Sequence, residues 1–128
     1  MKKFLSLAII SVLMLLAGCG GNNYKHLSQD EAVKMMTSNP DAIVIDVRSE
    51  EEYEKKHIPN VVLVPIDNLR AENFEALPNK DQMILIYCWT GRRSEEAAKI
   101  LGGHGYKNVY EFGGLVDWTG AAEGTEVE

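Results

Sequence analysis

Seven consecutive residues, Cys88-Trp89-Thr90-Gly91-Arg92-Arg93-Ser94, combine a nucleophile with groups that bind anions. They follow an apolar run over 83–87 that is typical of a buried strand, and they precede a stretch with helical periodicity. Ligands of parallel α/β sheets bind where strands end, and a helix N-terminus adds unpaired N–H groups and about half a positive charge. The sequence therefore predicts an anion-binding loop with a cysteine at its mouth.

Positive charge in this loop has two predicted uses. It favours the thiolate of Cys88, which is the reactive form of cysteine, so Cys88 is the predicted catalytic nucleophile. Arg92 and Arg93 can also hold a substrate oxyanion, because a guanidinium donates two hydrogen bonds in one plane. The loop is therefore expected both to bind an anion and to attack it.

The other loop residues are predicted to complete the substrate site. Gly91 lets the chain turn where a Cβ would clash. Thr90 and Ser94 can donate hydroxyl hydrogen bonds to the bound anion, and Ser94 is expected to open the following helix. Trp89 is expected to cover the pocket as a lid.

Alternating helix and strand signals along the chain predict an α/β domain with a mostly parallel sheet. Ser28 with Glu31, and Ser49 with Glu52, have the spacing of capping boxes and mark two helix starts. Strands are expected at 42–45, 61–64, 83–87 and 109–110. Helices are expected at 28–39, from 49, weakly within 69–77, at 94–101, and briefly after Gly114 through Trp118. Trp118 is expected in the core.

The N-terminal segment is predicted to direct export and lipid anchoring. Lys2 and Lys3 precede an apolar run over 4–16, as in a secretory signal peptide. The next residues, Leu16-Ala17-Gly18-Cys19, resemble the bacterial lipobox, in which the cysteine takes a diacylglycerol and becomes the new N-terminus. We expect a signal peptide at 1–18 and a lipidated tether at 19–23. The protein is then expected on the extracytoplasmic side of a bacterial membrane. Because the lipid occupies Cys19, Cys88 has no cysteine with which to form a disulfide. An ordinary signal peptide with an incidental Cys19 is the alternative.

Composition limits the partners and the size of the folded part. Removal of residues 1–18 leaves 110 residues, which suits one domain, predicted at 24–122, with a frayed acidic tail at 123–128. It also takes away two lysines, so the formal charge changes from −6 to −8. An acidic chain without a basic run argues against nucleic acid as a partner. The three histidines lack metal-ligand spacing with Cys88, so no metal is expected, and we expect a monomer.

The loop resembles the active-site loop of single-domain rhodaneses, Cys-x-x-Gly-x-Arg-Ser. Cys88, Gly91, Arg93 and Ser94 stand at the matching positions. Three other stretches agree in order with the family, across roughly 24–122. They are Asp46-Val47-Arg48, His57-Ile58-Pro59, and Gly113-Gly114 with Trp118, while Lys56, Asn60 and Leu63 depart from the usual residues.

The resemblance implies a rhodanese-like fold with about five strands in a central, mostly parallel sheet and helices on both faces. It implies a sulfurtransferase without cofactor, in which Cys88 takes the outer sulfur of an anionic donor such as thiosulfate or 3-mercaptopyruvate. The resulting persulfide passes its sulfur to cyanide, a thiol or a protein cysteine. Asp46 and Arg48 are expected to be structural supports that tie loops together.

Two other functions stay open at this point. A cysteine-dependent phosphatase or arsenate reductase also places cysteine and arginine in an anion-binding loop, usually with five residues between them, whereas four separate Cys88 from Arg93. The other is a non-catalytic rhodanese-like module that binds a partner protein. Such modules typically lose the cysteine, which is present here.

Overall fold

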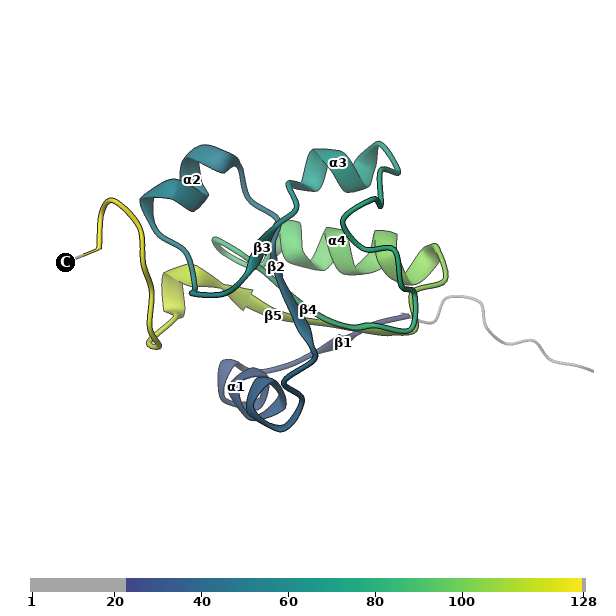
Figure 1. The fold of residues 1–128 in the computed structure, drawn as a ribbon, viewed down its shortest axis with the longest axis horizontal. Coiled ribbons are helices and arrows are strands. Elements are labelled where there is room, and N and C mark those ends of the chain that lie inside the picture. Colours follow the sequence, from purple (N-terminus) through teal and green to yellow (C-terminus); the bar gives the residue numbers. More distant parts are fainter. Residues whose placement is uncertain (1–22, 128) are drawn as a thin grey trace, which may run out of the picture.

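A sheet of five parallel strands forms the centre of the structure, which is a computed structural model that describes residues 23–127 (Figure 1). The spatial order is β1-β5-β4-β2-β3, and every pair of neighbours is parallel. The strands are β1 (Lys25–His26), β2 (Ile43–Asp46), β3 (Val62–Leu63), β4 (Met83–Cys88) and β5 (Asn108–Gly114). The central strand β4 is apolar and buried because it is covered on both faces.

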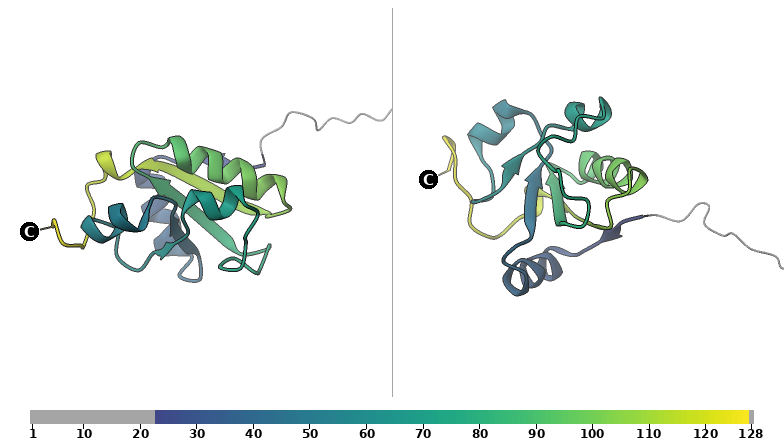
Figure 2. Two further views of the ribbon diagram at one scale, coloured as in Figure 1. Left: turned by 90° about the horizontal axis from the view of Figure 1, so that it is seen from above. Right: turned by 45° about the vertical axis from the view of Figure 1, so that its right-hand side comes forward.

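Helices cover both faces of this sheet, as predicted. Helix α1 (Gln29–Ser38) lies on one face, and α3 (Ile66–Arg70) and α4 (Arg92–Gly103) lie on the other (Figures 1 and 2). Residues of β4 alternate between two apolar clusters: Leu85 packs on the α1 side, and Ile86 and Cys88 pack on the α4 side. The predicted α/β architecture is therefore confirmed, and Cys88 is placed on the α4 face.

Both predicted capping boxes are present. The Ser28 Oγ accepts a hydrogen bond from the Glu31 N–H at 3.1 Å, and the Glu31 carboxylate accepts from the Ser28 N–H at 2.9 Å. Ser49 and Glu52 make the same two contacts at 3.2 Å each, at the start of α2 (Glu50–Lys55). These contacts join residues three apart, so the local sequence is sufficient to specify them.

Four elements differ from the prediction, and one of them, strand β1, was not predicted at all. The helix expected within 69–77 instead spans Ile66–Arg70 and is followed by Glu72 in a left-handed conformation, which the helix could not continue through. Helix α4 begins at Arg92 rather than at Ser94, because Gly91 adopts the left-handed conformation needed to enter a helix directly from the loop. Strand β5 is also longer than the predicted 109–110. Its continuation brings Glu111 and the two glycines beside β4.

The C-terminal segment from Glu123 is not frayed, contrary to the prediction. His57 and Glu123 exchange two backbone hydrogen bonds of 2.8 Å. The Thr125 and Glu126 N–H groups donate to carbonyls of α2, each at 2.9 Å, so this segment lies beside α2 (Figure 1). Backbone pairing orders the acidic segment despite its charge.

The predicted signal peptide, lipobox and most of the tether lie outside the described residues. Within 23–127, no helix has both the length and the apolar character needed to cross a membrane.

Trp118, expected in the core, is partly buried against Phe112, with ring centroids 6.0 Å apart, and its indole N–H donates to the Ala121 carbonyl at 3.0 Å. It follows the short helix η1 (Leu115–Asp117).

Candidate active site

Cys88 is the last residue of β4 and is fully buried, with 0% of its surface exposed. Its Sγ accepts a hydrogen bond from the Gly91 N–H at 3.0 Å and lies 3.6 Å from the Ser94 Oγ. Cys88 pairs with Gly114 of the neighbouring strand. The predicted nucleophile thus lies at the carboxyl end of the sheet, immediately before the N-terminus of α4, where negative charge is favoured.

Close backbone packing holds the loop against β5. A Cβ on Gly114 would lie 2.0 Å from the Trp89 carbonyl oxygen, a distance that no side chain tolerates. Gly91 has φ +106°, and a Cβ there would lie 3.4 Å from the Gly113 Cα. Glycine is required at position 114 by contact and at position 91 by backbone conformation.

Arg93 is tied to an acidic side chain rather than free in the loop. Its guanidinium donates two hydrogen bonds to the Glu52 carboxylate, at 2.7 and 3.0 Å. These hydrogen bonds lower the pKa of Glu52 to about 2, and the same contacts raise the pKa of Arg93. Part of the positive charge predicted for the substrate anion is therefore balanced by Glu52, a partner that the sequence analysis did not identify.

This ion pair predicts a small, pH-dependent contribution to stability. The folded-state pKa of Glu52 lies below its ordinary value of 4.5, so the stabilisation is complete above about pH 4.5 and is lost as the pH falls toward 2. Glu52 is partly exposed, so we expect less than about 1 kcal/mol. The melting temperature of the Glu52→Gln variant should lie below wild type at neutral pH and should converge with it below about pH 3. A difference that stayed constant over this range would contradict the assignment.

The loop separates residues that were predicted to share one pocket. Trp89 is 40% exposed and lines a pocket of about 290 Å³ together with Arg48, Lys55 and Lys56. Thr90, Gly91 and Arg92 line a different pocket of about 340 Å³, with Glu111 in its wall. Trp89 therefore lies in a pocket of mixed charge near α2, where Glu52 and Glu126 accompany the cationic side chains. Arg92 lines the other pocket.

Asp46 and Arg48 form a buried ion pair at the end of β2, where Asp46 pairs with Tyr87 of β4. The Arg48 Nη2 donates to Asp46 at 2.8 Å and to the Lys56 carbonyl at 2.6 Å, which ties the end of β2 to the end of α2. The Tyr87 hydroxyl donates to Asp46 at 2.6 Å, while its oxygen accepts the Ile58 N–H at 3.1 Å. Burial and the Asp46 charge raise the pKa of Tyr87, so the phenol stays protonated and keeps donating.

Sequence reasoning also missed Glu111, a buried acid behind the nucleophile. Glu111 of β5 is 5% exposed, and its carboxylate accepts hydrogen bonds from the Ser94 hydroxyl at 3.2 Å and the Gly113 N–H at 3.1 Å. Its other oxygen contacts the His26 Nδ1. The available signal was a single acid between Tyr110 and Phe112, next to the paired glycines, but the predicted strand ended before it.

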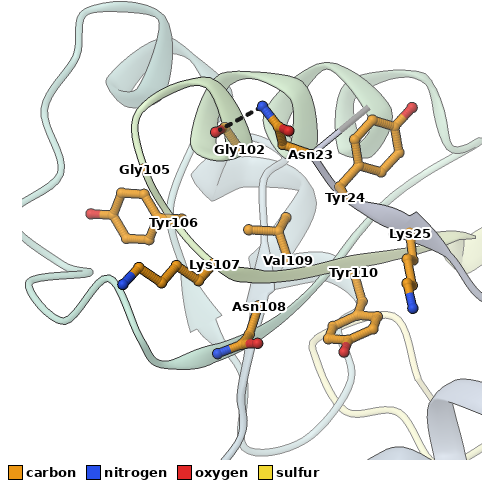
Figure 3. A pocket seen from close by; sticks show the side chains of 10 residues that line it. All are labelled: Asn23, Tyr24, Lys25, Gly102, Gly105, Tyr106, Lys107, Asn108, Val109 and Tyr110. Carbon is orange, nitrogen blue, oxygen red and sulfur yellow. Dashed lines mark hydrogen bonds between the residues drawn. The ribbon is translucent and has the colours of Figure 1, made fainter. Parts of the chain in front are cut away.

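A pocket of about 550 Å³ is not part of this site (Figure 3). It lies at the opposite ends of the strands, where β1 and β5 begin, beside the end of α4. Its lining residues include Tyr24, Lys25, Tyr106 and Lys107. Figure 3 also shows the Asn23 amide donating to the Gly102 carbonyl, at 3.3 Å, where the described chain begins. Among residues 23–127, no cluster of three or more His, Cys, Asp or Glu side chains could hold a metal ion.

Comparisons with known proteins agree with this geometry. The chain is 40% identical over 95 residues to YrkF of Bacillus subtilis, a protein named as a candidate sulfur carrier, covering 73% of this chain and 50% of that one. It is 38% identical over 97 residues to the tRNA uridine(34) hydroxylase of Photorhabdus laumondii, covering 69% and 26%. The chain thus spans half or less of these two curated relatives.

A solved structure described as a rhodanese with anions from E. coli superimposes with a TM-score of 0.59 at 31% identity, covering 65% of this chain and 98% of that one. The rhodanese-like domain profile matches residues 28–121, which include both capping boxes, the Cys88 loop and the paired glycines. This chain therefore belongs to the rhodanese-like domain family.

Proposed function

We propose that this protein is a sulfurtransferase that moves a sulfane sulfur from an anionic donor to a thiophilic acceptor through a persulfide on Cys88. The observation that carries the proposal is the placement of the Cys88 Sγ at the end of β4, with the Gly91 N–H directed at it. Both the thiolate and the persulfide are negative, and backbone N–H groups stabilise such charge without needing a counter-ion.

The proposed cycle has two displacements. The Cys88 thiolate attacks the outer sulfur of thiosulfate, a sulfur–sulfur bond forms on Cys88, and the donor's sulfur–sulfur bond breaks to release sulfite. An acceptor such as cyanide, a thiol or a protein cysteine then attacks the outer persulfide sulfur, and the Cys88 thiolate leaves. With cyanide the product is thiocyanate, and no net oxidation or reduction of the protein occurs. The name of the relative from Bacillus subtilis, a candidate sulfur carrier, supports this chemistry. We propose that the protein acts as a monomer and uses no cofactor.

The decisive measurement is the intact mass of the protein after exposure to a donor. Thiosulfate or 3-mercaptopyruvate should add about 32 Da, one sulfur, which cyanide or dithiothreitol then removes. In the rival phosphatase chemistry the Cys88 thiolate attacks phosphorus instead, so no sulfane sulfur is left on the protein. An unmodified mass with every donor, together with turnover of a phosphate ester, would replace the proposal with this rival. An unmodified mass and no turnover would favour the partner-binding module.

Arg93 is proposed to assist donor binding when the donor displaces part of its contact with Glu52. Losing a charge-assisted hydrogen bond costs about 1.5–3 kcal/mol, so Arg93→Ala should slow transfer by about one to two orders of magnitude. Arg93→Lys should restore only part of the rate, because it keeps the charge without the planar guanidinium. Steady-state rates with thiosulfate test both variants.

Glu52→Gln is the matched control for Arg93, because it removes the ion pair but leaves the guanidinium available. Its rate should stay within about threefold of wild type if Arg93 acts on the donor. Equal losses in the Arg93→Ala and Glu52→Gln variants would show that the ion pair serves the fold alone.

We further propose that the lipid on Cys19 anchors the protein to a bacterial membrane, on its extracytoplasmic side. The support is Leu16-Ala17-Gly18-Cys19 after a basic start and an apolar run. Two acyl chains give stable anchoring, so wild-type protein should sediment with membranes, and the Cys19→Ala protein should lack the lipid and change its partition. Mass spectrometry of the mature N-terminus is the test, and an unacylated wild-type N-terminus would remove this proposal.

A further inference from the structure

Cys88 has a buried acidic neighbour that the sulfur-transfer cycle above does not use. The Ser94 Oγ lies 3.6 Å from the Cys88 Sγ and 3.2 Å from the Glu111 Oε2, so one hydroxyl contacts both groups. Cys88 and Ser94 are fully buried, and Glu111 is 5% exposed. Hydrogen bonds thus connect the thiol to a carboxylate inside the protein.

The outer end of this connection reaches the surface. The Glu111 Oε1 contacts the His26 Nδ1, and the His26 side chain is 66% exposed. His26 and Glu111 both line the pocket of about 340 Å³ on the Arg92 side of the loop. A chain of contacts therefore leads from the buried Cys88 thiol to solvent through Ser94, Glu111 and His26.

Burial gives this route a chemical purpose. A thiol with no exposed surface cannot lose its proton directly to bulk water, yet the thiolate is the form that attacks a sulfur donor. A hydroxyl between a nucleophile and a carboxylate can pass a proton in one direction while accepting one from the other. Ser94 has this position, and the Gly91 carbonyl, 3.0 Å from its hydroxyl, is a second acceptor for the same proton.

We propose that Glu111 is a positioning residue that takes up the Cys88 thiol proton through the Ser94 hydroxyl. The S–H bond of Cys88 breaks as its proton moves to the Ser94 oxygen, and the Ser94 proton moves to Glu111. The products are a Cys88 thiolate, an unchanged serine and a neutral Glu111 carboxyl, so one negative charge moves from Glu111 to Cys88. His26 holds the carboxylate from the solvent side, and the proton returns by the same route.

Other charged and titratable groups around Glu111 come from α4 and from the segment that leads into β1. Arg92 and Glu95 of α4 line the same pocket, and Tyr24 precedes His26 at the start of β1. Helix α1 contributes the uncharged amide of Gln29, which donates to the Gly114 carbonyl at 2.8 Å. None of these groups contacts both Glu111 and Cys88, whereas Ser94 does.

The inference rests on the proposed role of Cys88 as a nucleophile, and alkylation of Cys88 tests it without any sulfur donor. The full chain is treated with iodoacetamide at several pH values, and the rate is followed on the peptide that contains Cys88. In wild type, thiol and carboxylate exchange a proton internally, so the rate should level off at mildly acidic pH. In Glu111→Gln no internal carboxylate is left to take the thiol proton, so the rate should keep falling about tenfold per pH unit. At a pH of about 5 this variant should react at least about tenfold more slowly.

Three further variants make the result specific. Ser94→Ala should lose the same plateau, and the double variant Ser94→Ala with Glu111→Gln should be no slower than either single variant, because both interrupt one route. Glu95→Gln is the matched control in the same pocket, where Glu95 pairs with Lys99 at 3.2 Å, and it should stay within about twofold of wild type. Circular dichroism checks the fold, and Ser94→Ala decides the matter if Glu111→Gln does not fold.

The inference predicts slower alkylation of Glu111→Gln than of wild type, and faster alkylation would contradict it. If Glu111 acts only as a nearby negative charge, its removal favours the thiolate, and Glu111→Gln would be alkylated as fast as wild type or faster at every pH. That result would overturn the inference even if wild-type protein accepts sulfur. A wild type that never accepts sulfur but shows the plateau, lost in Glu111→Gln, would instead remove the proposed function and leave the proton route standing.

Discussion

Cys88→Ser should reduce sulfur transfer to the uncatalysed background and should acquire no 32-Da adduct from any donor. A serine hydroxyl cannot carry a sulfane sulfur as a persulfide, and it is a much weaker nucleophile at neutral pH. The substitution changes one atom at a fully buried position, beside the Gly91 N–H and the Ser94 hydroxyl, which can hydrogen-bond to an oxygen instead. The fold should therefore persist while the chemistry stops. The measurement is thiocyanate formation from thiosulfate and cyanide, with intact mass on the same sample.

Cys19→Ser is the matched control, since it removes the other cysteine of the chain by the same change. Assayed in solution, it should transfer sulfur at the wild-type rate and gain one sulfur per chain. Loss of transfer in Cys19→Ser with retention in Cys88→Ser would assign the sulfur transfer to Cys19 and refute the proposed site.

Gly114→Ala should lower the transfer rate by about two orders of magnitude, although residue 114 has no side chain to contact a substrate. Its added Cβ would meet the Trp89 carbonyl oxygen at 2.0 Å, and both are held by backbone, so the loop after Cys88 has to move. A displacement of about 1 Å at a reacting group can cost about 100-fold in rate. The shift would also disturb the Gly91 N–H that donates to the Cys88 Sγ. Transfer rates and thermal unfolding of the variant test this.

Gly103→Ala is the control for Gly114, because a Cβ at position 103 meets no atom within 4 Å and the residue lies in helix α4. Alanine favours a helix over glycine, so this variant should keep wild-type activity and equal or slightly higher stability. Wild-type activity in Gly114→Ala would mean that the loop tolerates displacement and that its closeness to β5 does not position the nucleophile.

Local patterns in the sequence determined the class of fold and the place of the nucleophile. The capping boxes at Ser28 and Ser49 were predictable because each joins residues three apart in one helical turn. Cys88 was placed at the end of a buried strand because an apolar, partly β-branched run precedes it and a helical pattern follows. Alternating elements then require a parallel sheet, whose carboxyl edge collects the loops.

Tertiary structure alone decided which partners surround that nucleophile. Arg93 meets Glu52, 41 positions away, because the order β4-β2 puts the loops after these neighbouring strands at the same edge. The sequence pattern showed a free arginine in the loop, and the structure shows an ion pair. The tail from Glu123 was expected to fray, yet its backbone pairs with His57, 66 positions earlier, which no local pattern indicates.

Glu111 shows the physical reason for this division most clearly. In sequence it is one acid just beyond the predicted strand, and only its position between Tyr110 and Phe112 distinguishes it from a solvated residue. In the folded protein, β5 lies between β1 and β4, so Glu111 faces Ser94 behind the Cys88 loop on one side and His26 on the other. Hydrogen bonds between neighbours in sequence are set by local geometry, whereas contacts between distant residues depend on strand order and register, which only the assembled sheet determines.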